Sequence, residues 1–115
     1  MCESDFKFMC IIWDNEPLSS HDLVELCNER LGWKKSTAYT MLKKLCEKGF
    51  AKNDNSTITS LVAKEKVQEF ASEQFIKNSF DGSLPKFLTA FLGNKKISSK
   101  QANELKMLID SCKED

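Results

Sequence analysis

A basic stretch with helical periodicity, residues 33–50, limits most strongly what this chain can fold into. Its apolar residues recur at intervals of three and four positions, as on one side of a helix. The apolar side comprises Ala38, Met41, Leu42, Leu45 and Cys46. The opposite side comprises Ser36, Tyr39, Thr40, Lys43 and Glu47. Residues 34–52 hold six lysines and one acidic residue, although the chain as a whole has no net charge. A helix with one apolar face and one basic, hydrogen-bonding face is suited to the major groove of DNA.

Two further helices are predicted before this stretch. The first begins at the N-cap Ser4 and is broken at Pro17. The second begins with the capping pair Ser19 and Asp22 and ends at Gly32. Their apolar stripes consist of Phe6, Met9, Cys10 and Trp13, and of Leu23, Leu26, Cys27 and Leu31. Such stripes are typical of amphipathic helices that pack on a shared core.

The segment after Gly49 changes to the composition of β-strands. Residues 50–53 and 56–62 are predicted to pair as a hairpin, with Asp54 and Asn55 at its tip. Three helices followed by a hairpin indicate a winged helix-turn-helix domain over residues 1–63, with the hairpin as the wing.

Residues 64–115 carry three more predicted helices, the last of which begins with the capping pair Ser98 and Gln101. They hold more aromatic side chains than so short a segment can bury by itself, which predicts that two copies cover each other. The predicted fold is therefore mainly α with a small β-hairpin wing, a winged helix-turn-helix domain followed by a three-helix dimerisation domain. The predicted dimerisation residues are Phe70, Phe75, Phe80, Leu84, Phe87, Leu88, Phe91, Leu105, Leu108 and Ile109.

Composition narrows the remaining function classes. No apolar run approaches the roughly 20 residues of a membrane span, and the N-terminus lacks the apolar core of a signal peptide. We therefore expect a cytoplasmic protein without direct membrane binding. The one histidine, His21, is expected on the surface, and no nucleophile is paired with it. Neither enzymatic activity nor a cofactor is expected.

The five cysteines are widely spaced and include no CxxC pair, which favours free thiols over disulfides. Cys10, Cys27 and Cys46 are predicted to face inward and to converge. They can be read as small apolar core residues or as a buried metal or redox site, and their spacing does not support a metal. Cys2 and Cys112 are expected to be exposed.

DNA contacts can be assigned by side-chain chemistry. Tyr39 and Thr40 can reach base edges, and Lys43 can reach a guanine edge or a phosphate. Ser36 and Thr37 can donate to phosphate at the start of the helix. The full predicted set is Lys34, Lys35, Ser36, Thr37, Tyr39, Thr40, Lys43, Lys44 and Lys52. An alternative role for Lys44 is an ion pair with an acidic residue of the second helix.

Three stretches together resemble the penicillinase-repressor family of bacterial regulators (the BlaI/MecI/CopY group). They are SDFKFMCIIWDNEPLSSHDLVE, GWKKSTAYTMLKKLCEKGF and FIKNSFDGSLPKFLTAFLGNKKISSKQANELKMLI. The second is similar to the family pattern W-x-x-x-T-V-x-T-x-L-x-R-L-x-x-K-G. This pattern places the family's threonine pair on Thr37 and Thr40, and its arginine on Lys44.

The resemblance implies a homodimeric repressor that binds a dyad operator in double-stranded DNA, commonly upstream of resistance genes. It also implies induction by a membrane-bound sensor protease that cuts the C-terminal region. The family's Asn-Phe cleavage position aligns with Ala90 and Phe91. The wing is shorter than in the family, and Asn53-Asp54-Asn55 replaces its basic tip. The CxC pairs of copper-responsive relatives are absent, so no copper sensing is expected.

Two alternatives stay open. The chain could be a winged-helix protein–protein interaction module without sequence-specific DNA binding, because the wing is short and the net charge is zero. An inducer could also bind in an aromatic-lined gap between the dimerisation helices.

Overall fold

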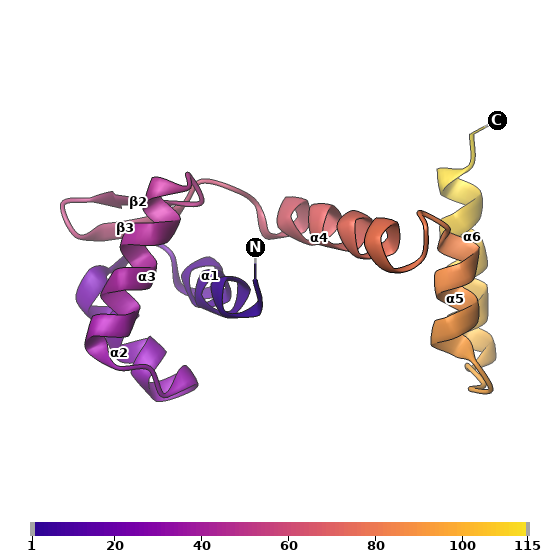
Figure 1. Ribbon diagram of the computed structural model, residues 1–115, viewed down its shortest axis with the longest axis horizontal. Helices are drawn as coiled ribbons and strands as arrows, with labels where there is room; N and C mark the ends of the chain where they lie inside the picture. Colours follow the sequence, from indigo (N-terminus) through magenta and orange to yellow (C-terminus); the bar gives the residue numbers. More distant parts are fainter. Residues whose placement is uncertain (1, 115) are drawn as a thin grey trace. The chain divides into compact units, whose positions relative to one another are not determined.

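The computed structural model describes residues 2–114, in which six helices and a small sheet follow one another along the chain (Figure 1). Packing divides these residues into two compact units, and the boundary along the chain falls between Gln74 and Phe75. The predicted domain boundary, after residue 63, lies just before the fourth helix, and the division in packing lies inside that helix. The elements are α1 (Glu3–Asn15), β1 (Leu18–Ser19), α2 (Ser20–Leu31), α3 (Lys35–Glu47), β2 (Ala51–Asp54), β3 (Thr57–Ser60), α4 (Lys64–Ser79), α5 (Leu84–Leu92) and α6 (Ser99–Cys112).

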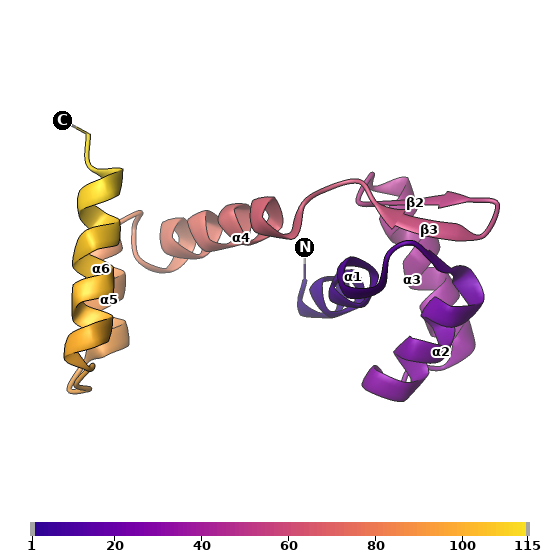
Figure 2. The ribbon, with the colours of Figure 1, turned by 180° about the vertical axis from the view of Figure 1, so that it is seen from behind.

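The first unit confirms the predicted winged-helix fold and adds one strand to it. The three strands form an antiparallel sheet in the order β1-β3-β2, with Leu18 opposite Ile58. Strand β1 was not predicted, because two residues are too few to show an alternating pattern. Figures 1 and 2 show the β2–β3 hairpin following the C-terminal end of α3.

The hairpin turns one residue later than predicted. Asp54 pairs with Thr57, so the two turn residues are Asn55 and Ser56, with φ angles of 50° and 69°. Both lie in the left-handed region that two-residue hairpin turns require. The Asn53 side chain accepts a hydrogen bond from the backbone N–H of Ser56 at 3.0 Å and supports this turn.

Helix α1 buries a different face from the predicted one. It begins at Glu3, with Cys2 rather than Ser4 at the N-cap position. Of the predicted stripe only Met9 is buried, whereas Phe6, Cys10 and Trp13 are half-buried. The buried residues of α1 are Asp5, Phe8, Met9, Ile11 and Ile12.

The predicted ends of α2 are confirmed. The Ser19 hydroxyl accepts from the backbone N–H of Asp22 at 3.0 Å, and Gly32 has a left-handed φ of 69°. The turn into α3 is closed by hydrogen bonds from Gly32 N to Asn28 O at 3.0 Å and from Trp33 N to Cys27 O at 3.3 Å. The Asn28 amide also donates to the carbonyl of Trp33 at 3.1 Å.

One apolar core joins α1, α2, α3 and the sheet of the first unit. The Trp13 indole donates to the carbonyl of Val62 at 3.0 Å and thereby ties α1 to the chain segment that precedes α4. Glu16 accepts hydrogen bonds from the backbone N–H and the hydroxyl of Ser60, both at 2.9 Å. The core residues are Phe8, Met9, Ile11, Ile12, Leu18, Leu23, Val24, Cys27, Ala38, Leu42, Leu45, Ala51 and Ile58.

The second unit is stabilised by aromatic contacts and helix caps. The rings of Phe75, Phe80 and Phe87 meet edge to face, with centroids 5.4–6.1 Å apart. Ser83 caps α5, and Ser98 caps α6 as predicted, by accepting from the backbone of Gln101 at 3.1 Å. Neither α5 nor α6 buries a residue within the described chain. None of the described helices is long and apolar enough to cross a membrane.

Candidate nucleic-acid interface

Helix α3 packs on the core with the predicted side. Ala38, Leu42 and Leu45 are buried, and Met41 and Cys46 are half-buried. Because α3 packs on one side only, the opposite face is available to a partner over the length of the helix. No side chain caps its first turn, so the N–H groups there are available to an anion.

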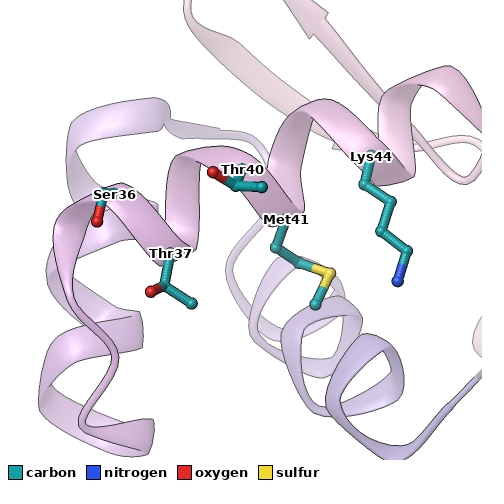
Figure 3. Close-up of a pocket in the computed structure, with 5 residues that line it drawn as sticks. All are labelled: Ser36, Thr37, Thr40, Met41 and Lys44. Carbon is teal, nitrogen blue, oxygen red and sulfur yellow. The ribbon is translucent and has the colours of Figure 1, made fainter.

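Hydroxyl groups line one flank of the exposed face. Ser36, Thr37 and Thr40 border an open hollow of about 380 Å³, together with Met41 and Lys44. Figure 3 shows the three hydroxyls along the first turns of α3, with the Lys44 side chain farther along the helix. The structure therefore brings the predicted short hydrogen-bonding residues to one surface, where they can donate to phosphate or base oxygens.

An aromatic and charged group lies on the other flank. The Lys35 ammonium lies 6.0 Å from the ring centroid of Tyr39, within reach of a cation–π interaction. Tyr39 is 39% exposed, and it borders a smaller hollow of about 240 Å³ with Lys35 and three residues of α2, including His21 and Glu25. His21 is exposed as predicted and lies 3.4 Å from Glu25.

Lys44 differs from the other lysines of this surface, because its ammonium is 3.2 Å from a carboxylate oxygen of Asp5. The acidic partner that was considered for Lys44 thus exists, but on α1 rather than on α2. The Asp5 side chain is 2% exposed. Burial acts to raise the pKa of Asp5, but hydrogen bonds from Lys44 and Cys2 and the positive charge of Lys44 outweigh it, so this pKa lies below its ordinary value.

Asp5 was not among the predicted residues of this surface. A signal for it was present, because Asp5 lies three and four positions before Phe8 and Met9 and therefore on the same face of α1 as both. A carboxylate on the buried face of a helix needs a cationic partner, which the sequence does not identify.

The wing carries little positive charge. Lys52 is exposed on β2, an edge strand of the sheet, and it is the one basic residue in residues 51–60. Asn53, Asp54 and Asn55 are all exposed at the tip. Lys52 is therefore the one cationic side chain that residues 51–60 offer to an anion.

Among the described residues, no thiol belongs to a group of three potential metal ligands. Cys27 is buried and its pKa is raised to about 11 by burial; burial also raises the pKa of Cys46. Cys10 is half-buried. Within residues 2–114, a group of three metal-ligand side chains forms at His21, Asp22 and Glu25, without a cysteine. These three are exposed on the first turns of α2, and exposed acidic groups commonly cluster without a metal ion.

The predicted dimerisation residues fall into two sets. Phe80, Phe87 and Leu88 are half-buried, whereas the others are exposed by 40–60%. Ala90 and Phe91, at the aligned cleavage position, lie in the last turn of α5, and Lys95 covers the Phe91 ring at 5.1 Å. The exposed members are Phe70, Phe75, Leu84, Phe91, Leu105, Leu108 and Ile109.

An apolar hollow of about 490 Å³ lies in the first unit, where the chain leaves the wing and enters α4. Phe50, Val62, Val67 and Phe70 contribute to its lining. This hollow differs from the predicted inducer site, which is expected between the dimerisation helices.

Comparison with known proteins identifies the family. A family model described as penicillinase repressor matches residues 1–111. The chain is 22% identical over 115 residues to the penicillinase repressor of Bacillus licheniformis, covering 96% of this chain and 90% of that protein. It is 24% identical over 110 residues to an uncharacterised 16.5 kDa protein from the ptsI 3′ region of Latilactobacillus sakei, covering 92% of this chain and 75% of that protein. The chain therefore belongs to the penicillinase repressor family, a family of winged-helix transcriptional regulators rather than enzymes.

Proposed function

We propose that this protein is a homodimeric repressor that binds a dyad operator through the exposed face of α3. The observation that carries the proposal is the geometry of this face, which presents hydroxyl, phenol and ammonium groups while its opposite side is packed on the core. The proposed DNA-contacting residues are Lys34, Lys35, Ser36, Thr37, Tyr39, Thr40, Lys43 and Lys52.

These residues divide by reach and chemistry. Tyr39, Thr40 and Lys43 are proposed to contact base edges, because α3 presents them on its exposed face. The start of α3 with Lys34 and Lys35 is proposed to bind phosphates, which fix the register of the helix without specifying sequence. We expect each half-site to neutralise about four phosphates. The logarithm of the binding constant then falls linearly with the logarithm of the salt concentration, with a slope of roughly 0.9 per phosphate contact.

Dimerisation is proposed to occur through α4, α5 and α6. The exposed apolar side chains of these helices support this, since a monomer rarely leaves a large apolar surface in water. A two-fold dimer would present two α3 helices to the two halves of a dyad operator.

Regulation is proposed to resemble that implied by the Bacillus licheniformis relative. A resistance-type operon is the proposed target, because the Bacillus licheniformis relative is a penicillinase repressor. Induction by a membrane-bound sensor protease is proposed at Ala90–Phe91. That bond lies inside α5, so the last turn of α5 must open before a protease can bind it as an extended chain.

The test is a combined alanine substitution of Tyr39, Thr40 and Lys43, measured by gel shift and light scattering. The variant should lose selective retention of operator fragments recovered from the source genome and should remain a dimer. Glu47→Ala is the matched control, because Glu47 is exposed near the end of the same helix.

The competing function is a protein–protein interaction module, which the short wing without a basic tip favours. It predicts that the unmodified protein shows no sequence preference in DNA binding at low salt. That result would refute the repressor proposal.

A further inference from the structure

A buried carboxylate of α1 lies against the recognition helix α3. Asp5 is the one charged residue among the buried side chains described, and its Oδ1 atom lies 3.2 Å from the Lys44 Nζ atom. The two residues are 39 positions apart, so this contact depends on the packing of α1 against α3. No buried polar side-chain atom within residues 2–114 lacks a hydrogen-bond partner.

The pair restricts Lys44 more than its exposure suggests. The Lys44 side chain is 43% exposed, so its stem could turn toward solvent. Turning would leave the buried Asp5 charge without a cationic partner, which is strongly unfavourable. A phosphate contact at the surface is solvated and screened by salt, so it does not compensate for that loss.

The neighbouring lysines have no such restriction. Among the described residues, Lys34, Lys35 and Lys43 form no ion pair with a carboxylate, and all three are exposed. Their ammonium groups can therefore move to a phosphate without breaking an internal ion pair. Lys44 also contributes to the hollow beside Thr40 and Met41, where its position affects the shape of the contact surface (Figure 3).

We propose that Asp5 is a positioning residue for operator recognition. By holding Lys44, it connects α1 to α3, fixes the rotation of α3 about its axis and withholds Lys44 from DNA phosphates. This inference rests on the proposed function, since it assumes that α3 contacts DNA. It assigns Lys44 to the internal support of the interface and leaves the phosphate contacts to the unpaired lysines.

The salt dependence of operator binding tests where the Lys44 charge acts. Lys44→Gln and Lys34→Gln each remove one positive charge and replace the ammonium with a neutral amide, which can still donate a hydrogen bond. In a dimer that binds both half-sites, Lys34→Gln should lower the log–log salt slope by about 1.8, since each lost phosphate contact contributes about 0.9. Lys44→Gln should leave the slope unchanged and lower the ratio of operator to random-DNA affinity by about tenfold.

A double-mutant cycle tests the positioning role. Asp5→Asn, which keeps the side-chain shape, should lower the same affinity ratio by about tenfold without reducing random-DNA affinity. The double variant should lose no more than either single variant, because both remove the same contact. Circular dichroism at the assay temperature identifies the folded variants. If Asp5→Asn does not fold, the slope measured with Lys44→Gln decides.

The outcomes separate the two proposals. Three results would each overturn the positioning role alone. The first is a fall in the salt slope for Lys44→Gln equal to that for Lys34→Gln. The others are additive losses in the double-mutant cycle and an unchanged ratio of operator to random-DNA affinity for Asp5→Asn. Absence of operator preference in the unmodified protein would overturn the proposed function, and this inference with it.

Discussion

Leu108→Ala should raise the dissociation constant of the proposed dimer, by an amount that follows from the exposure of Leu108. Leu108 lies on α6 and is 60% exposed in the single chain. Full burial of a leucine side chain is worth about 1.5–3 kcal/mol, so covering the exposed part is worth about 1–2 kcal/mol per chain. Both chains of a two-fold dimer lose this contribution, about 2–4 kcal/mol in total, and the dimer dissociation constant should rise by about thirty- to a thousandfold. Alanine is a strong helix former, so α6 itself should persist.

Sedimentation equilibrium over a range of protein concentrations measures this change. Asn103→Ala is the control, because Asn103 is exposed on the side of α6 away from the stripe that holds Leu105 and Leu108. An unchanged dissociation constant for Leu108→Ala, or an equal rise for the control, would show that this face of α6 does not form the dimer.

Three other outcomes are expected. Ser56→Gly should raise the free energy of unfolding by about 0.5–1 kcal/mol, because Ser56 has a φ of 69° that glycine adopts without strain. Urea unfolding measures this as a higher midpoint, and a lower midpoint would show that the turn does not carry this strain. The pKa of Asp5 lies below its ordinary value of 3.8, so its ionised form stabilises the fold at neutral pH, and this contribution is lost as the pH falls below 3.8 and through the folded pKa. Unfolding experiments at several pH values should therefore show the stability difference between the unmodified protein and Asp5→Asn shrinking in acid; a difference independent of pH contradicts the ion pair. Alkylation at pH 8 followed by mass spectrometry should label the exposed Cys2, whose pKa the Ser4 hydrogen bond lowers, well before Cys27, whose pKa burial raises to about 11; equal rates would show that the core around Cys27 opens readily.

The helices with one clear apolar stripe were predictable from the sequence. The α2 boundaries follow from Ser19 and Gly32, and the buried side of α3 follows from the spacing of Ala38, Leu42 and Leu45. In each case a local signal, a cap or a period, agrees with the packing in the structure.

The face of α1 could not be predicted in the same way. Phe6, Phe8, Met9, Ile11 and Trp13 surround the helix with apolar side chains, so several stripes fit the spacing equally well. Which stripe is buried depends on contacts with α2, α3 and the sheet. Strand β1 is too short to show a period, and it forms because β3 provides a partner.

The site was predictable as a surface but not as a network. The polar residues of α3 lie on its exposed face, as the helical period requires. The contact between Asp5 and Lys44 joins residues far apart in sequence, and a local pattern cannot reveal which lysine a buried carboxylate binds.

The exposed face of α3 also has a consequence for how this protein can diverge. Within the described chain, the side chains of Ser36, Thr37, Thr40 and Lys43 form no hydrogen bond or ion pair with another residue. Substitutions at such positions usually change stability by no more than about 0.5 kcal/mol. The closed turn at Gly32 and the packed side of α3 keep the helix in place for any side chain at these four positions that a helix tolerates, which excludes proline inside the helix. Under the proposed function, duplicated copies of such a gene can therefore acquire new operator preferences through single substitutions on this face, without compensating changes in the core.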